Sequence, residues 1–67
     1  MNANRKQALL RSALTALYCG KVEVAERAIW QIPSDERSKN VTHIASDLEK
    51  IRELLKWAII DLHREIE

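Results

Sequence analysis

The 67-residue sequence contains one cysteine, one glycine, one proline and no phenylalanine. Cys19 therefore has no partner for an internal disulfide, and an unpaired cysteine is typical of a reducing cytoplasm. A single glycine excludes a glycine-rich phosphate-binding loop. These shortages predict an all-α cytoplasmic chain that no disulfide stabilises.

Long apolar runs are also missing. No segment approaches the ~20 apolar residues of a membrane helix, and Arg11, Ser12 and Thr15 interrupt the N-terminal apolar run. We therefore expect neither a membrane segment nor a secretion signal. A domain of this length buries only about 60% of the surface that its unfolded chain exposes. Such domains usually add a disulfide, a metal or a partner subunit, and a partner subunit is the option left open here.

Residue groups that carry catalysis or bind metals are scarce. His43 and His63 lie twenty residues apart without companions at zinc-binding spacing. Cys19 has no histidine near it in sequence to act as a base, so we expect it to be a small buried apolar residue. The sequence thus predicts a protein that is not an enzyme and that needs neither a metal nor a cofactor.

Charge is distributed unevenly along the chain. Residues 1–21 carry a net charge of +4, and residues 22–67 carry −3. We expect Arg5, Lys6 and Arg11 to steer an acidic partner protein toward the N-terminal end. The alternative is that these residues bind nucleic acid, although the acidic remainder lacks the basic stripe of most DNA-binding domains.

Three helices are predicted within a single domain of residues 1–67. After a flexible segment 1–4, with Asn2 or Asn4 as cap, the first helix covers 5–19 and ends at Gly20, which suits a left-handed C-terminal position. The second covers 21–32 and ends at Pro33. The third covers 35–66, with Ser34 as N-cap and its firmest part from residue 41.

The first two helices resemble the helical hairpin of a tetratricopeptide repeat. Ala13, Ala16, Gly20, Ala25 and Ile29 stand at the small and apolar positions of that motif. The leading tryptophan of the family is absent, the proline comes early, and there is no second copy. The resemblance covers less than half of the chain and implies a tight helical hairpin.

The third segment has a heptad pattern. Residues of a seam that we expect to mediate self-association recur at spacings of three and four: Val41, Ile44, Leu48, Ile51, Leu55, Ala58 and Leu62. Within LLKWAII at residues 54–60, Trp57 and Ile60 point away from this seam. A helix that is apolar nearly all round is normally covered on more than one side. Leu54, Trp57, Ile59 and Ile60 are therefore predicted to bind a partner, and Trp30 to close the core over Pro33.

Together these patterns predict an all-α fold with a short N-terminal helical hairpin packed on a long C-terminal amphipathic helix. We expect the long helices to associate as a helical-bundle homodimer, or as a tetramer because residues 54–60 are apolar on two sides. The predicted function is that of a small non-catalytic protein-binding regulator or adaptor, such as an inhibitor of a larger protein. A dimeric nucleic-acid-binding regulator and a purely structural oligomerisation module are the alternatives.

Overall fold

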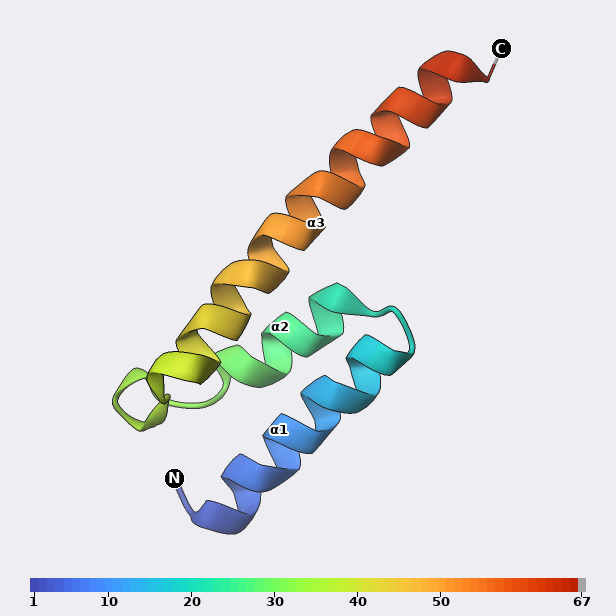
Figure 1. Ribbon diagram of the computed structural model, residues 1–67. Helices are drawn as coiled ribbons and strands as arrows, with labels where there is room; N and C mark the ends of the chain where they lie inside the picture. The colour runs from blue at the N-terminus through green and yellow to red at the C-terminus, as the bar shows by residue number, and fades with distance from the viewer. Residues whose placement is uncertain (67) are drawn as a thin grey trace.

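The computed structural model describes residues 1–66, and within them the chain folds into three α-helices and one short 3₁₀ turn (Figure 1). The elements are α1 (Ala3–Tyr18), α2 (Val22–Trp30), η1 (Ser34–Glu36) and α3 (Lys39–Glu65). α1 and α2 form an antiparallel hairpin, α2 packs on α3, and α3 runs antiparallel to α2. The all-helical prediction is thereby confirmed.

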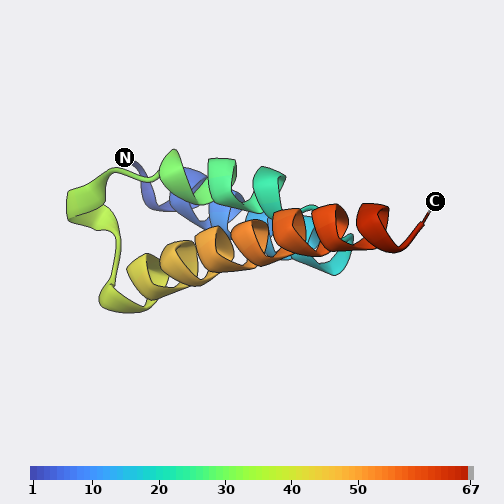
Figure 2. The same cartoon turned by 90° about the horizontal axis from the view of Figure 1, so that it is seen from above.

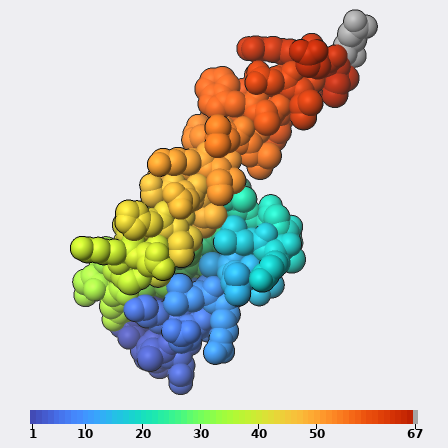
Figure 3. Space-filling model, in the orientation of Figure 1, coloured from blue at the N-terminus to red at the C-terminus, as the bar shows by residue number. Residues whose placement is uncertain are grey.

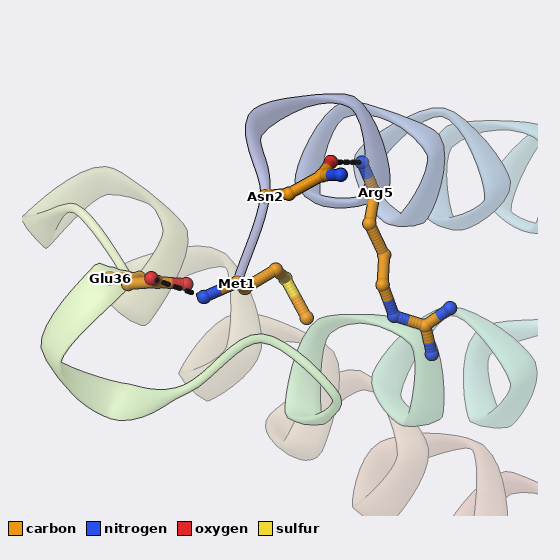
Figure 4. A network of polar contacts seen from close by, with 4 residues as sticks. All are labelled: Met1, Asn2, Arg5 and Glu36. Carbon is orange, nitrogen blue, oxygen red and sulfur yellow. Dashed lines mark hydrogen bonds and ion pairs between the residues drawn. The ribbon is translucent and has the colours of Figure 1, made fainter.

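The N-terminal end of α1 is held in place by two polar contacts (Figure 4). The Asn2 side chain caps the helix, because its Oδ1 accepts a hydrogen bond from the backbone N–H of Arg5 at 3.0 Å. The Met1 ammonium group donates to Glu36 Oε1 in η1 at 2.8 Å. The helix starts at Ala3, earlier than the sequence suggested, so residues 3 and 4 belong to α1 rather than to the segment 1–4 expected before it.

The turn between α1 and α2 depends on Gly20. Gly20 has φ of +74°, the left-handed conformation that the sequence predicted at this position. Its N–H donates to the carbonyl of Leu17 at 3.0 Å, and the N–H of Lys21 donates to the carbonyl of Ala16 at 2.8 Å. These two bonds make a Schellman motif, which satisfies carbonyls that the end of α1 would otherwise leave free. Cys19, at the C-cap, is exposed rather than buried as expected, because the turn directs it away from the core.

The core is small and rich in alanine. Its buried side chains come from all three α-helices: Ala13, Ala16, Ala25, Ala28, Ile29, Val41, Ala45 and Leu48. Leu10 and Val22 pack against this cluster from its edges. Alanine at helix contacts allows the helix axes to approach closely, but each alanine removes little apolar surface from water. The hairpin is therefore closely packed but gains little from the hydrophobic effect.

The connection between α2 and α3 differs from the prediction. Ile32, which is fully buried, closes the core beside Pro33. Trp30 instead remains 52% exposed, with the guanidinium of Arg37 4.6 Å from its ring centroid. Arg37 Nε also donates to the carbonyl of Ile32 at 2.8 Å, which fixes the loop. α3 begins only at Lys39, because Ser38 rather than Ser34 caps it by accepting from the N–H of Val41.

α3 is three times as long as α2 and extends well beyond the hairpin (Figure 1). Seen from above, its C-terminal end lies past the hairpin turn (Figure 2). The molecule measures 51 × 20 × 14 Å, so it is a rod with a thick end. On the face that Figure 3 displays, the hairpin ends near the middle of α3, and the C-terminal part of the helix stands clear of it. The core therefore covers only the first half of the long helix.

An ion pair joins α2 to α3 where α3 leaves the hairpin. Arg52 Nε donates to Glu26 Oε1 at 2.9 Å, and the Glu26 side chain is only 9% exposed. This hydrogen bond and the charge of Glu26 raise the pKa of Arg52 above its ordinary value. A nearly buried carboxylate without its cation would be costly, so this contact fixes the register between the two helices.

Replacing Gly20 with alanine is expected to destabilise the fold by about 1 kcal/mol, the cost of a left-handed conformation for a residue with a Cβ. Among the described residues nothing lies within 4 Å of a Cβ built at this position, so the loss reflects backbone strain alone. Gly20→Asn should cost less, because asparagine tolerates this conformation better than alanine. Thermal denaturation followed by circular dichroism measures both, and an unchanged melting temperature for Gly20→Ala would contradict the assignment.

Replacing Arg52 with methionine should lower the melting temperature, because Glu26 is left nearly buried without its cation. The matched control is Arg27→Met, which removes an exposed i,i+4 pair between Arg27 and Glu23 at 3.5 Å. Exposed pairs contribute little, so the control should melt close to the unaltered chain. Adding Glu26→Gln to Arg52→Met should restore part of the loss. Equal melting temperatures for the two arginine variants would show that the pair does not hold α2 to α3.

Candidate functional site

One stripe of residues runs along the side of α3 that faces the hairpin and ends at Ile66, the C-cap residue that follows the helix. Its members alternate at spacings of four and three residues: Val41, Ala45, Leu48, Arg52, Leu55, Ile59, Leu62 and Ile66. Residues at these spacings lie on one face of a helix with 3.6 residues per turn. We call this set the hairpin-facing stripe.

The hairpin covers only the first half of the stripe. Val41, Ala45 and Leu48 are buried in the core, and Arg52 bonds to Glu26 of α2. The other four members continue the same pattern past the end of the hairpin, and all are apolar. Their exposure runs from 49% at Ile59 to 69% at Ile66. The second half of the stripe is thus built like a core-facing surface but lies in solvent.

The predicted self-association seam is divided by this arrangement. Val41 and Leu48 are already covered by the hairpin of their own chain, so their side chains are not free for a second chain. Ile44, Ile51 and Ala58 lie beside the stripe and are exposed, and Leu55 and Leu62 belong to its exposed half. The hairpin contacts Ala45 and Arg52, which follow Val41 and Leu48 by four residues. The sequence pattern instead predicted Ile44 and Ile51, which follow them by three.

A second apolar surface lies on the opposite side of the same helix half. Trp57 precedes Ile59 by two residues, which places it about 160° around the helix. It is 56% exposed, and Leu54 beside it is 68% exposed. The two flank a shallow and mostly apolar depression that Ser46, Glu49, Lys50 and Glu53 complete. Because all six residues belong to one helix, the depression is a surface for a partner to cover rather than an enclosed cavity.

The four residues predicted to bind a partner do not share one face. Leu54 and Trp57 are neighbours at the depression, and Ile60, which is half-buried, lies about 60° from Trp57 in the other direction. Ile59 belongs to the hairpin-facing stripe instead. We define the outer face as Leu54, Trp57 and Ile60.

The basic residues expected to steer a partner are spread around α1. Lys6 lies about 20° from Ala13 around the helix and is half-buried on the side of α1 that faces the core. Arg5 flanks that side, and Arg11 lies about 160° from Ala13, on the opposite side. The three charges therefore make no continuous basic surface, and nucleic-acid binding by this segment stays a prediction.

Potential metal ligands lie apart from one another in the described part of the chain. Within residues 1–66, no three side chains of His, Cys, Asp or Glu cluster closely enough to hold a metal ion. His43 and His63 are both exposed on α3. No helix in this part of the chain has both the length and the apolar character needed to cross a bilayer.

Comparison of the chain with protein families, with curated proteins and with solved structures found no match to any of them. The candidate site is therefore defined by its own geometry.

Sequence reasoning missed two features of the site. The first is the pairing of Glu26 with Arg52, whose members are 26 residues apart and carry no local signal. The second is that Ala45 and Arg52, rather than Ile44 and Ile51, complete the stripe. The apolar run Val41, Ala45, Leu48 could have indicated this, but the charged Arg52 interrupts it, so the series with Ile44 and Ile51 looked more regular.

Enlarging a side chain tests whether the stripe residues face the hairpin. Ala45 is 2% exposed at the contact between α2 and α3, so Ala45→Leu should destabilise the fold by about 1–3 kcal/mol through overpacking. Ala58→Leu is the control, because Ala58 is exposed and outside the stripe, and it should change stability by less than about 0.5 kcal/mol. Urea unfolding measures both. If Ala45→Leu is neutral, residue 45 does not face the hairpin.

Proposed function

We propose that this protein is a small non-catalytic protein-binding regulator or adaptor, and that the C-terminal half of α3 is its binding element. It binds one protein partner through the outer face and a further copy of itself through the other side of the helix. Action as an inhibitor that occupies the surface of a larger protein suits a domain of this size.

The exposure of Trp57 carries this proposal. A tryptophan that lies on the far side of its helix from the only core in the described chain contributes nothing to that core. Tryptophan is enriched at the centres of protein interfaces, where one side chain supplies much of the binding energy. With Leu54 it presents an apolar anchor, and Glu49, Lys50 and Glu53 supply the polar rim that interfaces have.

Helix-in-groove recognition is the binding mode that fits this surface. In that mode an amphipathic helix places residues at i and i+3 or i+4 into an apolar groove of the partner. Leu54 and Trp57 have the i,i+3 spacing on a straight and exposed helix half. The partner is therefore expected to present a groove, with its rim lined by charges that complement Lys50 and Glu53.

Self-association is supported by the amount of apolar surface on the other side of the helix. Leu55, Ile59 and Leu62 are each about half exposed or more, and they repeat the spacing that the hairpin covers earlier in α3. Exposed apolar stripes of this kind mark protein interfaces in soluble proteins.

Replacing Trp57 with alanine should strongly reduce capture of the partner from extracts of the source cells, because the interface loses its anchor. The control is Trp30→Ala. Trp30 is 52% exposed, close to the 56% of Trp57, but it lies at the other end of the molecule under Arg37. Tagged forms of the unaltered chain and both variants are compared by quantitative mass spectrometry of the bound proteins.

The expected result is a protein that is retained by the unaltered chain and by Trp30→Ala and is reduced roughly tenfold or more with Trp57→Ala. Circular dichroism checks that both variants keep their helices. Equal recovery of every bound protein by the two variants would refute a role for the outer face.

A further inference from the structure

We infer that a second copy of this chain covers the exposed half of the hairpin-facing stripe, with the two C-terminal halves of α3 antiparallel about a two-fold axis. The inference rests on the self-association proposed above and adds its orientation and register. It leaves the outer face free in both copies.

The position of α2 determines the orientation. α2 lies on the first half of the stripe and runs antiparallel to α3 (Figure 1). A helix that covered the second half in the parallel orientation would need its own first half to occupy the place where α2 already lies. An antiparallel helix instead ends there. Its continuation, with the hairpin of the second copy, lies beyond the C-terminal end of the first copy.

The register follows from matching apolar residues about the two-fold axis. With the axis between Ile59 and Leu62, Ile59 lies opposite Leu62 of the second copy. Leu55 then lies opposite Ile66 of the second copy, and symmetry repeats both contacts. This is an isologous interface, in which the same patch serves both chains. Each copy thus supplies to the other the kind of antiparallel apolar helix that α2 supplies to residues 41–52.

Charge complementarity supports the same arrangement. The C-terminal end of the second copy's α3 arrives at a groove beside the hairpin turn, lined by Gly20, Lys21, Val22, Glu23, Val24, Arg52 and Leu55. Lys21 is a cation there, whereas Arg52 is already paired with Glu26, and the N-terminal end of α2 adds the positive end of its dipole. The arriving end carries Glu65 and the negative end of the α3 dipole, and its Arg64 lies 3.7 Å from Asp61 of the same helix. Glu23 also lines the groove, but its carboxylate lies 3.5 Å from Arg27.

The interface is small. It consists of one face of residues 55–66 from each chain together with the groove beside the turn, which places it near the ~1,200 Å² lower end of specific interfaces. We therefore expect a dimer that forms at high concentration and dissociates on dilution. The folded monomer persists, because the core does not involve residues 55–66.

Sedimentation over a range of protein concentrations tests the location of the interface. The unaltered chain should shift from monomer to dimer as concentration rises. Ile59→Lys places a charge beside the axis and should weaken dimerisation roughly tenfold or more. Leu54→Lys, on the outer face, is the control and should dimerise like the unaltered chain. Circular dichroism of Ile59→Lys should retain the helices of the monomer, because Ile59 is not part of the core.

Cysteine cross-linking tests the orientation. In a Cys19→Ser background, one tagged chain carries Leu55→Cys and a second chain of different mass carries Ile66→Cys. A disulfide requires Cα atoms within about 7 Å, whereas positions 55 and 66 are about 16 Å apart along one helix. Oxidation of the mixture should therefore yield the 55–66 heterodimer, and neither variant alone should yield a cross-linked homodimer.

The outcomes separate this inference from the function on which it rests. A heterodimer formed only in the mixture supports the antiparallel register. Rapid cross-linking of Leu55→Cys with itself shows a parallel pair, which overturns this inference while self-association stands. A chain that remains monomeric at every concentration overturns both this inference and the proposed self-association. The exposed half of the stripe would then be a surface for a different protein. Loss of the dimer with Leu54→Lys but not with Ile59→Lys would place self-association on the outer face and also overturn the inference.

Discussion

The difference in length between α2 and α3 is the constraint on which the rest of the structure depends. Nine residues of α2 cover about 14 Å, whereas the 27 residues of α3 extend over about 40 Å. The chain has no further helix in its described part to cover the remainder. The heptad pattern of α3 nevertheless continues unchanged past Arg52. The sequence thus maintains an apolar face where the described fold provides nothing to bury it, and this mismatch is the reason that we propose the C-terminal half as the binding element.

The alanine-rich core explains why so much of the hairpin is fixed by polar contacts. Five of the eight residues in the core cluster are alanine, so the hydrophobic contribution is modest for the number of helices that meet there. Specific contacts at the helix ends, together with one contact between the middles of α2 and α3, fix the geometry instead. They are the Asn2 cap, the Gly20 turn, the Arg37 contact with Ile32, and the ion pair between Glu26 and Arg52. The last of these determines where α3 leaves the hairpin, and therefore which residues of the stripe are exposed.

Local chemistry predicted the helices well and their contacts poorly. Gly20 acts within a few residues of itself, so the end of α1 could be recognised. Asn2 and Asn4 both suit a cap by local rules, and the helix starts at Ala3 rather than at residue 5 as predicted. Ser34 and Ser38 are equally good caps by local rules, and the structure uses Ser38. The contacts of Arg37 to Trp30 and Ile32 in the same loop arise only in the folded chain. The prediction of which α3 residues face the hairpin was wrong for the same reason, because it depends on contacts that form only in the folded chain. Arg52 looks polar in sequence, but its partner Glu26 makes it an inward-facing residue.

The candidate site was found in sequence from the excess of apolar residues around residues 54–60, but its division into two faces required the structure. The position of α2 identifies one side of the helix as the continuation of a core-facing stripe, which assigns Ile59 to a different face from Trp57.

If a second copy covers that side, as we propose, Leu54 and Trp57 remain exposed at about the middle of the resulting rod. The two copies then present two outer faces related by the same two-fold axis. A partner that has a single groove would bind each face independently, whereas a dimeric partner with matching spacing would gain from binding both, because the second contact becomes intramolecular. The proposed self-association of α3 would therefore favour symmetric partners without adding any contact to the outer face itself.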